Sequence, residues 1–463
     1  MPRRLLALAL IALAATALPP GARAQQVVAQ EGESVTLRIT SNRELQRVVT
    51  LLLRDGRADD ARALIRAWQP DHPDHAVRVA YVEGLIASAQ GDDAEAVRIY
   101  REILAARPEL ERVRLALAAA LFRLEDDDAA AFQARQLIAA GVDDRIGGTL
   151  QSLIKTIDAR RPVRFRGFAS ILPSTNVTGG SRRQTVTFGG RESEIDDGEE
   201  SGIGALVGGE VLLRGQIDAD TAAVGQVAGT LRHYPDIERT LLGWEVAAGV
   251  ERQVGRRLRL LPQLILGGNV EDWTTVRRFV GGRFELSATL PPAWRVFASP
   301  SLIREEYPDL SRDLRAAAAQ GSEATLAGAD GTVLDVPVQL DRFIGPGRFV
   351  RAIGGYRRGD KNADRYTFQE WRAGAGAYAE LPWGLTLYGQ GTYAWRDYEG
   401  GSRSVDGDRE DRRLVGLLAV TKRDLAFRGF APRVTYSYER NRSNDPFQDR
   451  ESHDLELRFT REF

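Results

Sequence analysis

The pattern of hydrophobic and polar positions changes its period once along this chain of 463 residues. Up to about residue 160, apolar residues recur at helical spacing. From Val163 onward they alternate with polar residues, which is the period of a strand with one apolar face. The segment RVTYSYER shows this alternation, because Val434, Tyr436 and Tyr438 are separated by polar residues. The pattern predicts a helical part followed by a β part.

The helical part repeats itself at a step of 35 residues. A turn glycine, a small residue, a large apolar residue and a proline recur: Gly56 and Gly91; Ala61, Ala96 and Ala131; Ile65 and Tyr100; Pro73 and Pro108. This order is typical of tetratricopeptide repeats (TPR). We therefore expect a short segment over 25–41 and a periplasmic TPR-like solenoid over 42–160, capped by an apolar stripe from Ile146 to Ile157. A generic array of helical hairpins is the alternative.

The β part contains fourteen alternating segments. They centre near residues 168, 208, 225, 246, 262, 283, 298, 339, 352, 373, 389, 416, 434 and 458. Connections after even-numbered segments are short, such as GQID, and those after odd-numbered segments are longer, notably 173–201, 304–332, 396–410 and 441–451. An even strand number with loops segregated in this way is the pattern of an outer-membrane barrel. Residues 161–463 are expected to form a 14-stranded antiparallel transmembrane β-barrel.

The last segment, SHDLELRFTREF, has one polar face and one largely apolar face. Taken alone it would also suit the edge strand of a soluble sandwich. In a barrel it must pair with Val163–Leu172, because an open edge in lipid leaves unpaired backbone groups. Phe459 and the terminal Phe463 resemble the signal recognised by the barrel assembly machinery. Trp294 and Trp383 lie beside short turns, where an interfacial aromatic girdle is expected.

The N-terminus predicts export. Arg3 and Arg4 precede an apolar run from Leu5 to Leu18, and Ala22-Arg23-Ala24 supplies a small-residue cleavage site. Because a spanning helix needs about 20 apolar residues, this run indicates a signal peptide over 1–24. The chain has no cysteine, so disulfides, thiolate metal sites and a lipidated N-terminal cysteine are excluded. A net charge of −1 gives no bulk field for nucleic acid.

No enzyme, cofactor or metal site is expected. Only His233 and His453 lie in the β part, so a Ser/His site would have to use one of them. The acidic run Glu194–Glu200 lacks the ordered spacing of a calcium loop and indicates a solvated charge run.

Two segments carry a family resemblance. VRLALAAALFRLEDDDAAAFQARQLIAAGV, followed by RRPVRFRGFASILPSTNVTGG, resembles the surface lipoprotein assembly modifier (Slam) family. In that family a TPR domain runs into a first strand ending in a Pro-(Asp/Ser)-x-Asn-(Ile/Val)-x motif, here Pro173 to Thr178 with its Asn176. The C-terminal hairpin is also similar, although Asp445–Arg450 carries fewer aromatic residues than usual. The resemblance covers about residues 80–463. It implies a fourteen-stranded barrel that moves lipoproteins or small soluble binding proteins across the outer membrane.

The leading interpretation is a translocator in the cell outer membrane, whose periplasmic repeats collect a client. Client lipoproteins or secreted proteins, the barrel assembly machinery and outer-membrane lipid are the expected partners. The candidate client contacts lie on first helices of repeats, which line the groove of such solenoids: Arg78, Tyr81, Leu85, Ser88, Arg114, Leu117 and Leu121. An alternative places Leu85, Leu117 and Leu121 in the core between repeats. Arg78 and Arg114 are expected to be exposed.

The expected lumen is polar and of mixed charge. Its predicted lining residues alternate with apolar ones along their strands: Glu210, Arg214, Glu370, Arg372, Arg433, Glu439, Glu456 and Arg458. Three other interpretations stay open at this point. They are a porin-like channel with an accessory domain, an exopolysaccharide export barrel with a TPR domain, and a structural anchor.

Overall fold

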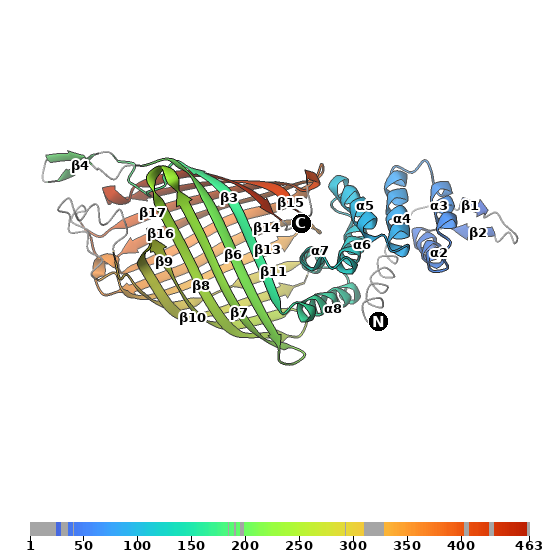
Figure 1. Ribbon diagram of the computed structural model, residues 1–463, viewed down its shortest axis with the longest axis horizontal. Coiled ribbons are helices and arrows are strands. Elements are labelled where there is room, and N and C mark those ends of the chain that lie inside the picture. The colour runs from blue at the N-terminus through green and yellow to red at the C-terminus, as the bar shows by residue number, and fades with distance from the viewer. Residues whose placement is uncertain are drawn as a thin grey trace.

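The computed structural model describes residues 25–28, 36–39, 41–183, 185–188, 191–194, 199–291, 293–309, 328–401, 407–425 and 430–460. The expected signal peptide and Phe463 lie outside these ranges. The described chain forms a helical part at one end of a β-barrel (Figure 1). Two residues, Arg161 and Pro162, join the last helix to the first barrel strand.

The helical part starts after a small hairpin of β1 (Gln25–Val28) and β2 (Thr36–Ile39). Its described helices are α2 (Asn42–Arg54), α3 (Ala58–Ala67), α4 (His75–Ala89), α5 (Asp93–Ala106), α6 (Glu111–Arg123), α7 (Asp127–Ala140) and α8 (Asp144–Arg160). The Ser41 hydroxyl caps α2 by accepting from the Glu44 amide at 3.3 Å. The helices from α2 to α7 pair as hairpins, and α8 packs on α7.

The sequence repeat is visible in how these hairpins turn and touch. Gly56 and Gly91 end α2 and α4 with φ of 76° and 85°, in the left-handed region that glycine adopts without strain. At the third turn Glu125 takes this conformation instead, with φ of 61°. The recurring small residues Ala61 and Ala96 are fully buried, as a close helix contact requires.

The barrel is built from antiparallel neighbours with these bounds: β3 (Val163–Ser174), β6 (Gly202–Gln216), β7 (Thr221–Tyr234), β8 (Arg239–Val254), β9 (Leu258–Glu271), β10 (Thr274–Leu290), β11 (Trp294–Ala298), β12 (Ser301–Glu306), β13 (Gly331–Phe343), β14 (Arg348–Lys361), β15 (Phe368–Leu381), β16 (Leu385–Tyr398), β17 (Glu410–Lys422), β18 (Ala431–Ser443) and β19 (Arg450–Thr460). β11 and β12 are halves of one strand, because both pair with β10 and β13 in a constant register. Pro300, which has no N–H to donate, lies at the break. The described strands therefore form a closed 14-stranded barrel, as predicted.

The last strand pairs with the first, which confirms the expected closure. The β19–β3 ladder contains Asp454 opposite Ser174, Leu457 opposite Ile171 and Arg458 opposite Ser170. The β18–β19 ladder, by comparison, runs without interruption from Asn441–Arg450 to Ala431–Thr460. The seam between the last strand, β19, and the first strand, β3, is thus the least continuous junction among the described barrel strands.

The short turns lie at the helical end of the barrel, and the longer connections lie at the opposite end (Figure 1). The long connection after β3 carries a further hairpin, β4 (Thr185–Phe188) and β5 (Arg191–Glu194). Two connections at the far end are also short: η1 (Pro235–Ile237) between β7 and β8, and two residues between β9 and β10. Loop length therefore segregates by end, but not at every connection.

The two barrel faces differ in chemistry. Outward-facing side chains are apolar and exposed, for example Phe165, Leu264 and Leu302. Trp383 at the helical end and Trp273 at the far end are among the most exposed aromatic residues, at 75% and 80%. An exposed apolar belt bordered by aromatic residues is the lipid-facing surface of a transmembrane barrel. Trp294, in contrast, is half-buried with Arg342 over its ring.

None of the helices in the described ranges is long and apolar enough to cross a membrane.

Candidate functional site: the helical face, the barrel mouth and the lumen

A buried ion pair joins the helical part to the barrel rim. Arg114 of α6 donates from Nη2 to Glu380 Oε2 at 2.7 Å and from Nη1 to Oε1 at 3.2 Å. These side chains are 1% and 3% exposed. Gln133 Oε1 and the Pro108 carbonyl accept from the same guanidinium, and Arg423 approaches Glu380 Oε2 from the barrel side at 2.8 Å. Glu380 therefore lies between two arginines, one from each part of the molecule.

Apolar side chains extend this contact. Ala139 of α7 is buried against Ala293, Phe343 and Phe349 of the barrel rim, and Tyr378 packs on the same cluster. The rings of Phe349 and Tyr378 stack with centroids 5.1 Å apart. Buried apolar area and a paired buried charge together make a docked interface rather than a passing contact.

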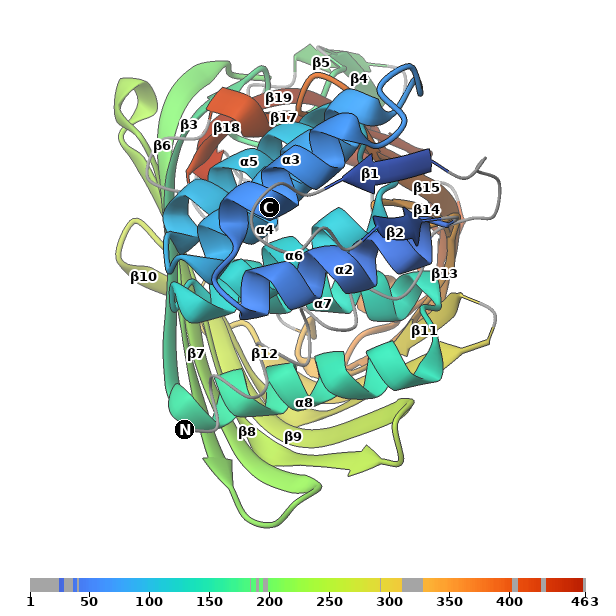
Figure 2. The same cartoon turned by 90° about the vertical axis from the view of Figure 1, so that its right-hand side faces the viewer.

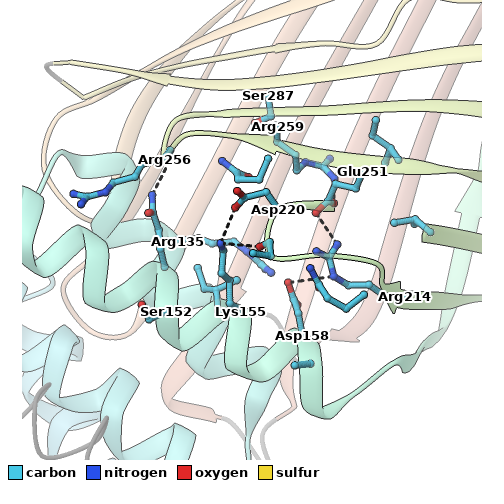
Figure 3. Close-up of a pocket in the computed structure, with 18 of the residues that line it drawn as sticks. Arg135, Ser152, Lys155, Asp158, Arg214, Asp220, Glu251, Arg256, Arg259 and Ser287 are labelled. Atoms are coloured by element: carbon cyan, nitrogen blue, oxygen red, sulfur yellow. Dashed lines mark hydrogen bonds and ion pairs between the residues drawn. The ribbon is translucent and has the colours of Figure 1, made fainter. Parts of the chain in front are cut away.

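The last helix crosses the other side of the mouth. Viewed from the helical end, α6, α7 and α8 lie across the barrel opening (Figure 2). α8 meets the turns through exposed polar contacts: Lys155 Nζ lies 3.2 Å from Asp220 Oδ1, and Gln151 Nε2 donates to the Arg256 carbonyl at 2.7 Å. Under α8, a cavity of about 1550 Å³ extends to the inner wall of the barrel (Figure 3).

The lumen is lined by paired charges. The eight residues predicted to face it lie on the inward side of their strands, between outward apolar neighbours. Ion pairs link neighbouring strands of the wall in Arg259–Glu285, Arg277–Glu305, Arg351–Asp341, Arg396–Glu370 and Arg413–Glu439. Arg283 of β10 reaches past β9 to pair with Glu245 of β8. A wall of this kind is wettable and of mixed sign, as expected from the sequence.

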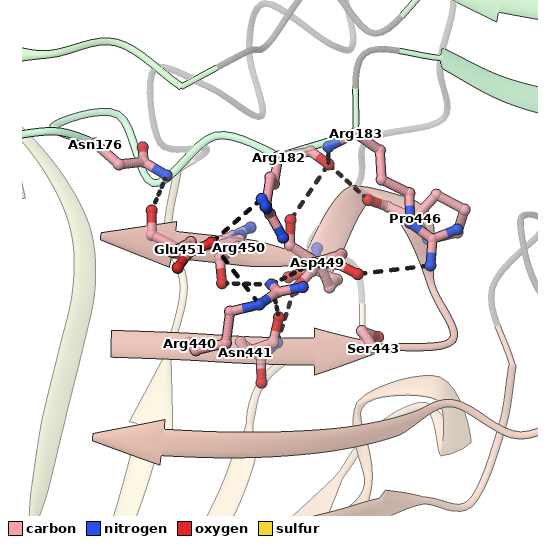
Figure 4. Close-up of polar contacts among 12 residues, drawn as sticks. Asn176, Arg182, Arg183, Arg440, Asn441, Ser443, Pro446, Asp449, Arg450 and Glu451 are labelled. Carbon is pink, nitrogen blue, oxygen red and sulfur yellow. Dashed lines mark hydrogen bonds and ion pairs between the residues drawn. The ribbon is translucent and has the colours of Figure 1, made fainter. Parts of the chain in front are cut away.

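The far end of the seam is fastened by Asn176, which follows the family-like Pro173 at the end of β3. Its Nδ2 donates to the carbonyl oxygens of Gly180 and Glu451, both at 3.0 Å, and its Oδ1 accepts from the Gly180 amide. The Ser181 hydroxyl donates to the Pro446 carbonyl at 2.7 Å. Figure 4 shows the bond from Asn176 to Glu451. The loop after the first strand is thereby bonded to the closing hairpin, where the β19–β3 ladder is thin.

The residues predicted to contact a client are mostly buried. Tyr81, Leu85, Leu117 and Leu121 are at most 9% exposed and belong to the helical core, which agrees with the alternative interpretation of the leucines. Burial also raises the pKa of the Tyr81 phenol to about 12.

Polar partners hold the remaining predicted contacts. Arg78 is half-buried, lies over the Trp68 ring and donates to Gln69 Oε1 at 2.9 Å. The Ser88 hydroxyl donates to Asp93 at 2.7 Å. The expectation that Arg114 is exposed is wrong, because the barrel rim supplies its carboxylate partner and covers it.

Arg112 is a residue of the helical part that the sequence reasoning missed. Its side chain is half-buried beside Tyr81, and burial lowers the pKa of its guanidinium to about 10. Within the described chain its Nη1 and Nη2 have no hydrogen-bond partner, and neither has the Tyr81 hydroxyl. Unmet buried donors are rare and costly in folded proteins. The available signal was a second arginine near the start of the apolar run Val113–Phe122.

Metal ligands do not gather in the described part of the chain. No group of three or more His, Cys, Asp or Glu residues is placed there to hold an ion. The side chains of the acidic run after Glu194 lie largely outside the described residues.

Solved barrels resemble part of the chain. OmpT, an outer membrane protein of Vibrio cholerae, is 9% identical, with 64% of this chain and 99% of that chain covered and a TM-score of 0.33. A mutant of the TodX monoaromatic hydrocarbon channel is 10% identical, with 65% and 90% covered and a TM-score of 0.36.

Sequence comparisons identify relatives along both parts of the chain. A protein named Surface lipoprotein assembly modifier 1 from Neisseria meningitidis is 26% identical over 399 residues, which are 83% of this chain and 75% of the relative. The Surface lipoprotein assembly modifier of Pasteurella multocida is 22% identical over 405 residues, 83% of this chain and 76% of the relative.

Two family descriptions match, one in each part. Residues 38–134 match "Surface lipoprotein assembly modifier, N-terminal TPR repeats", and residues 313–463 match "Surface lipoprotein assembly modifier". Together the matches cover more than half of the chain. They agree with an outer-membrane β-barrel preceded by TPR helices. The chain therefore belongs to the surface lipoprotein assembly modifier family.

Proposed function

We propose that this protein delivers client proteins across the outer membrane, with its helical part engaging the client in the periplasm. The clients are surface lipoproteins or small secreted binding proteins. The observation that carries the proposal is the docking of the helices across the barrel mouth through Arg114 and Glu380. A polypeptide bound to these helices is held directly before a charged lumen.

The helical face offers polar groups for such a client. Arg112 and Tyr81 lie side by side with unmet hydrogen-bonding capacity in the described chain. Because these atoms are shielded from solvent, a client carboxylate or backbone carbonyl would reach the Arg112 guanidinium only after this side chain turns outward, and the charge-assisted hydrogen bond formed there is stronger than a neutral one. We therefore propose Arg112 as a client-binding residue in place of the buried Arg114.

The lumen suits passage of a polar chain. Many inward charges of the described strands are paired within the wall, so a moving polypeptide meets fewer isolated charges to which it would bind irreversibly. Water can solvate both the wall and an extended chain. The names of the relatives refer to assembly of surface lipoproteins, which supports delivery of lipoprotein clients as the function.

A porin-like channel and an exopolysaccharide exporter are the competing functions. A diffusion channel does not need helices docked over its entrance, so the docked helices favour a translocator over a porin-like channel. The barrel assembly machinery and outer-membrane lipid are proposed as further partners, the first during insertion of the barrel and the second around its apolar belt.

Surface shaving of intact cells tests the proposal and identifies the client in the same experiment. Lipoprotein fragments released by protease are identified by mass spectrometry in strains producing the full protein, no protein, or the Arg112→Glu variant. Arg47→Glu is the matched control, since Arg47 is exposed on α2. The proposal expects specific lipoproteins to disappear from the surface in the null and Arg112→Glu strains only. An unchanged surface in the null strain contradicts translocation, and loss in the Arg47→Glu strain contradicts the role of Arg112.

A further inference from the structure

The cavity under α8 has the size and lining of a polypeptide site. Its volume of about 1550 Å³ exceeds the roughly 300–1,000 Å³ of small-molecule pockets. The described residues that line it are polar, charged or small aliphatic, with no aromatic side chain among them. Stacked nucleobases, which require aromatic platforms, are therefore poor occupants.

The acidic side chains of the cavity are already neutralised. Seven line it, and each forms an ion pair with an arginine or lysine. Asp158, for example, lies 3.3 Å from Arg164, and Glu251 lies 2.6 Å from Arg214. Bringing a cationic ligand into the cavity would require one of these pairs to be broken.

Three arginines of the cavity have no such partner in the described chain. Arg135 comes from α7, Arg145 from α8 and Arg256 from the turn between β8 and β9, and all three side chains are exposed to the solvent of the cavity. Desolvation lowers the pKa of Arg135, and Arg164 and Arg166 act in the same direction; Asp158, which is already paired with Arg164, offsets this only in part. The site thus has uncompensated positive charge distributed over three elements.

We propose that the cavity under α8 is a binding site for an acidic stretch of an extended polypeptide. The three arginines supply bidentate donors that suit carboxylates. Their separate origins suit a ligand with several carboxylates along a chain rather than one small anion. That this polypeptide is a client rests on the proposed function. Binding of an acidic polypeptide in the cavity does not depend on that function.

A binding measurement on the purified full-length protein in detergent tests the site. The probe is a short fluorescein-labelled peptide of alternating glutamate and alanine, followed by fluorescence anisotropy, with the glutamine–alanine peptide as reference. Replacing all three arginines (R135Q, R145Q, R256Q) should weaken binding of the acidic peptide about tenfold, as expected for three solvated ion pairs. The matched control replaces three exposed arginines of α2, Arg43, Arg47 and Arg54, and should leave the affinity within about twofold.

Location is tested by a photo-reactive benzoylphenylalanine in place of Ser152, whose side chain lines the cavity. The acidic peptide should cross-link there, and excess unlabelled peptide should suppress the product. Equal affinity for the two peptides, or equal weakening by the control triple, would overturn the site. If inorganic phosphate displaces the peptide more strongly than sodium chloride of the same ionic strength does, the cavity is a small-anion site and the polypeptide assignment is overturned. The peptide experiment measures neither a client nor transport. A failed translocation assay therefore does not overturn peptide binding in the cavity, and failed peptide binding does not overturn translocation.

Discussion

Arg114 and Glu380 lie 266 residues apart in the sequence, yet their side chains form a bidentate pair shielded from solvent. The pair is the polar centre of the contact between helices and barrel, and Arg423 completes it. Because Glu380 pairs with two arginines, removing Glu380 affects the interface differently from removing Arg114.

We predict that Glu380→Gln loosens the docked helices more than Arg114→Gln does. Loss of Glu380 leaves the buried Arg114 and the partly buried Arg423 without their shared carboxylate, whereas loss of Arg114 leaves Glu380 paired with Arg423. Removing one partner of a buried pair costs about 3–5 kcal/mol. The measurement is urea-dependent proteolysis of the helical part in detergent, with Arg98→Gln on the exposed face of α5 as control. Equal midpoints for both variants and the control would show that the pair does not hold the interface.

We predict that the docked helices restrict ion flow. Deleting residues 42–158 should raise the single-channel conductance of the barrel in planar bilayers, because α6, α7 and α8 lie across its mouth (Figure 2). Glu380→Gln should raise it as well, without any deletion, and Arg98→Gln should not. High conductance of the unmodified protein would instead favour a porin-like channel.

Asn176→Ala should weaken the far end of the barrel seam. The substitution removes three hydrogen bonds that tie the loop after β3 to itself and to Glu451, and an unsatisfied buried partner costs about 1–3 kcal/mol. The temperature at which the folded band is lost in heat-modifiable electrophoresis should fall. Asn362→Ala, at an exposed asparagine of another far-end loop, should leave it unchanged. The same fall in both variants would assign the effect to loop composition rather than to the seam.

Replacing Phe463 by Asp, or deleting it, should reduce the amount of folded barrel. Phe459, four residues earlier in the sequence, lies on the lipid face of β19 and is 60% exposed, and the sequence predicts that Phe459 and Phe463 together form the assembly signal. Folded and unfolded bands in heat-modifiable gels measure the effect, and Phe463→Tyr should preserve assembly. A folded fraction that survives the aspartate would remove Phe463 from the assembly signal.

The mature protein is predicted to begin at Gln25 and to fractionate with outer membranes. The apolar run before Ala24 is too short to span a bilayer and ends in a small-residue cleavage site. N-terminal sequencing of the membrane fraction checks both statements. Met1 retained on the membrane-bound protein, or recovery in the soluble periplasm, would contradict them.

The barrel could be predicted almost strand by strand because lipid and lumen impose opposite chemistry on alternate residues. In the strand around Trp371, for example, every inward and outward position follows from the sequence. The same periodicity argument fails inside the helical part, where Leu85 and Leu117 suit a groove and a core equally well. Burial by neighbouring repeats decides between them, and this depends on packing rather than on pattern.

Contacts between the two parts lay beyond sequence reasoning. Arg114 lies in the apolar run Val113–Phe122, which indicates a buried charge. The residues near it in sequence do not predict that Glu380 is its partner. The cavity under α8 is similar, since Arg135, Arg145 and Arg256 come together only when the helix is placed across the mouth. Long-range placement therefore decided which charges are free for a ligand.

The two-residue junction between α8 and β3 has a kinetic consequence. Arg161 and Pro162 are so short a link that anything the helices hold stays within a small volume before the mouth, even when the docked contact loosens. Encounter with the lumen then becomes intramolecular, with an effective concentration in the mM range, as for modules joined by short linkers. If the helices bind a client as proposed, weak and short-lived binding is therefore enough to keep a client at the entrance, and fast release favours repeated turnover.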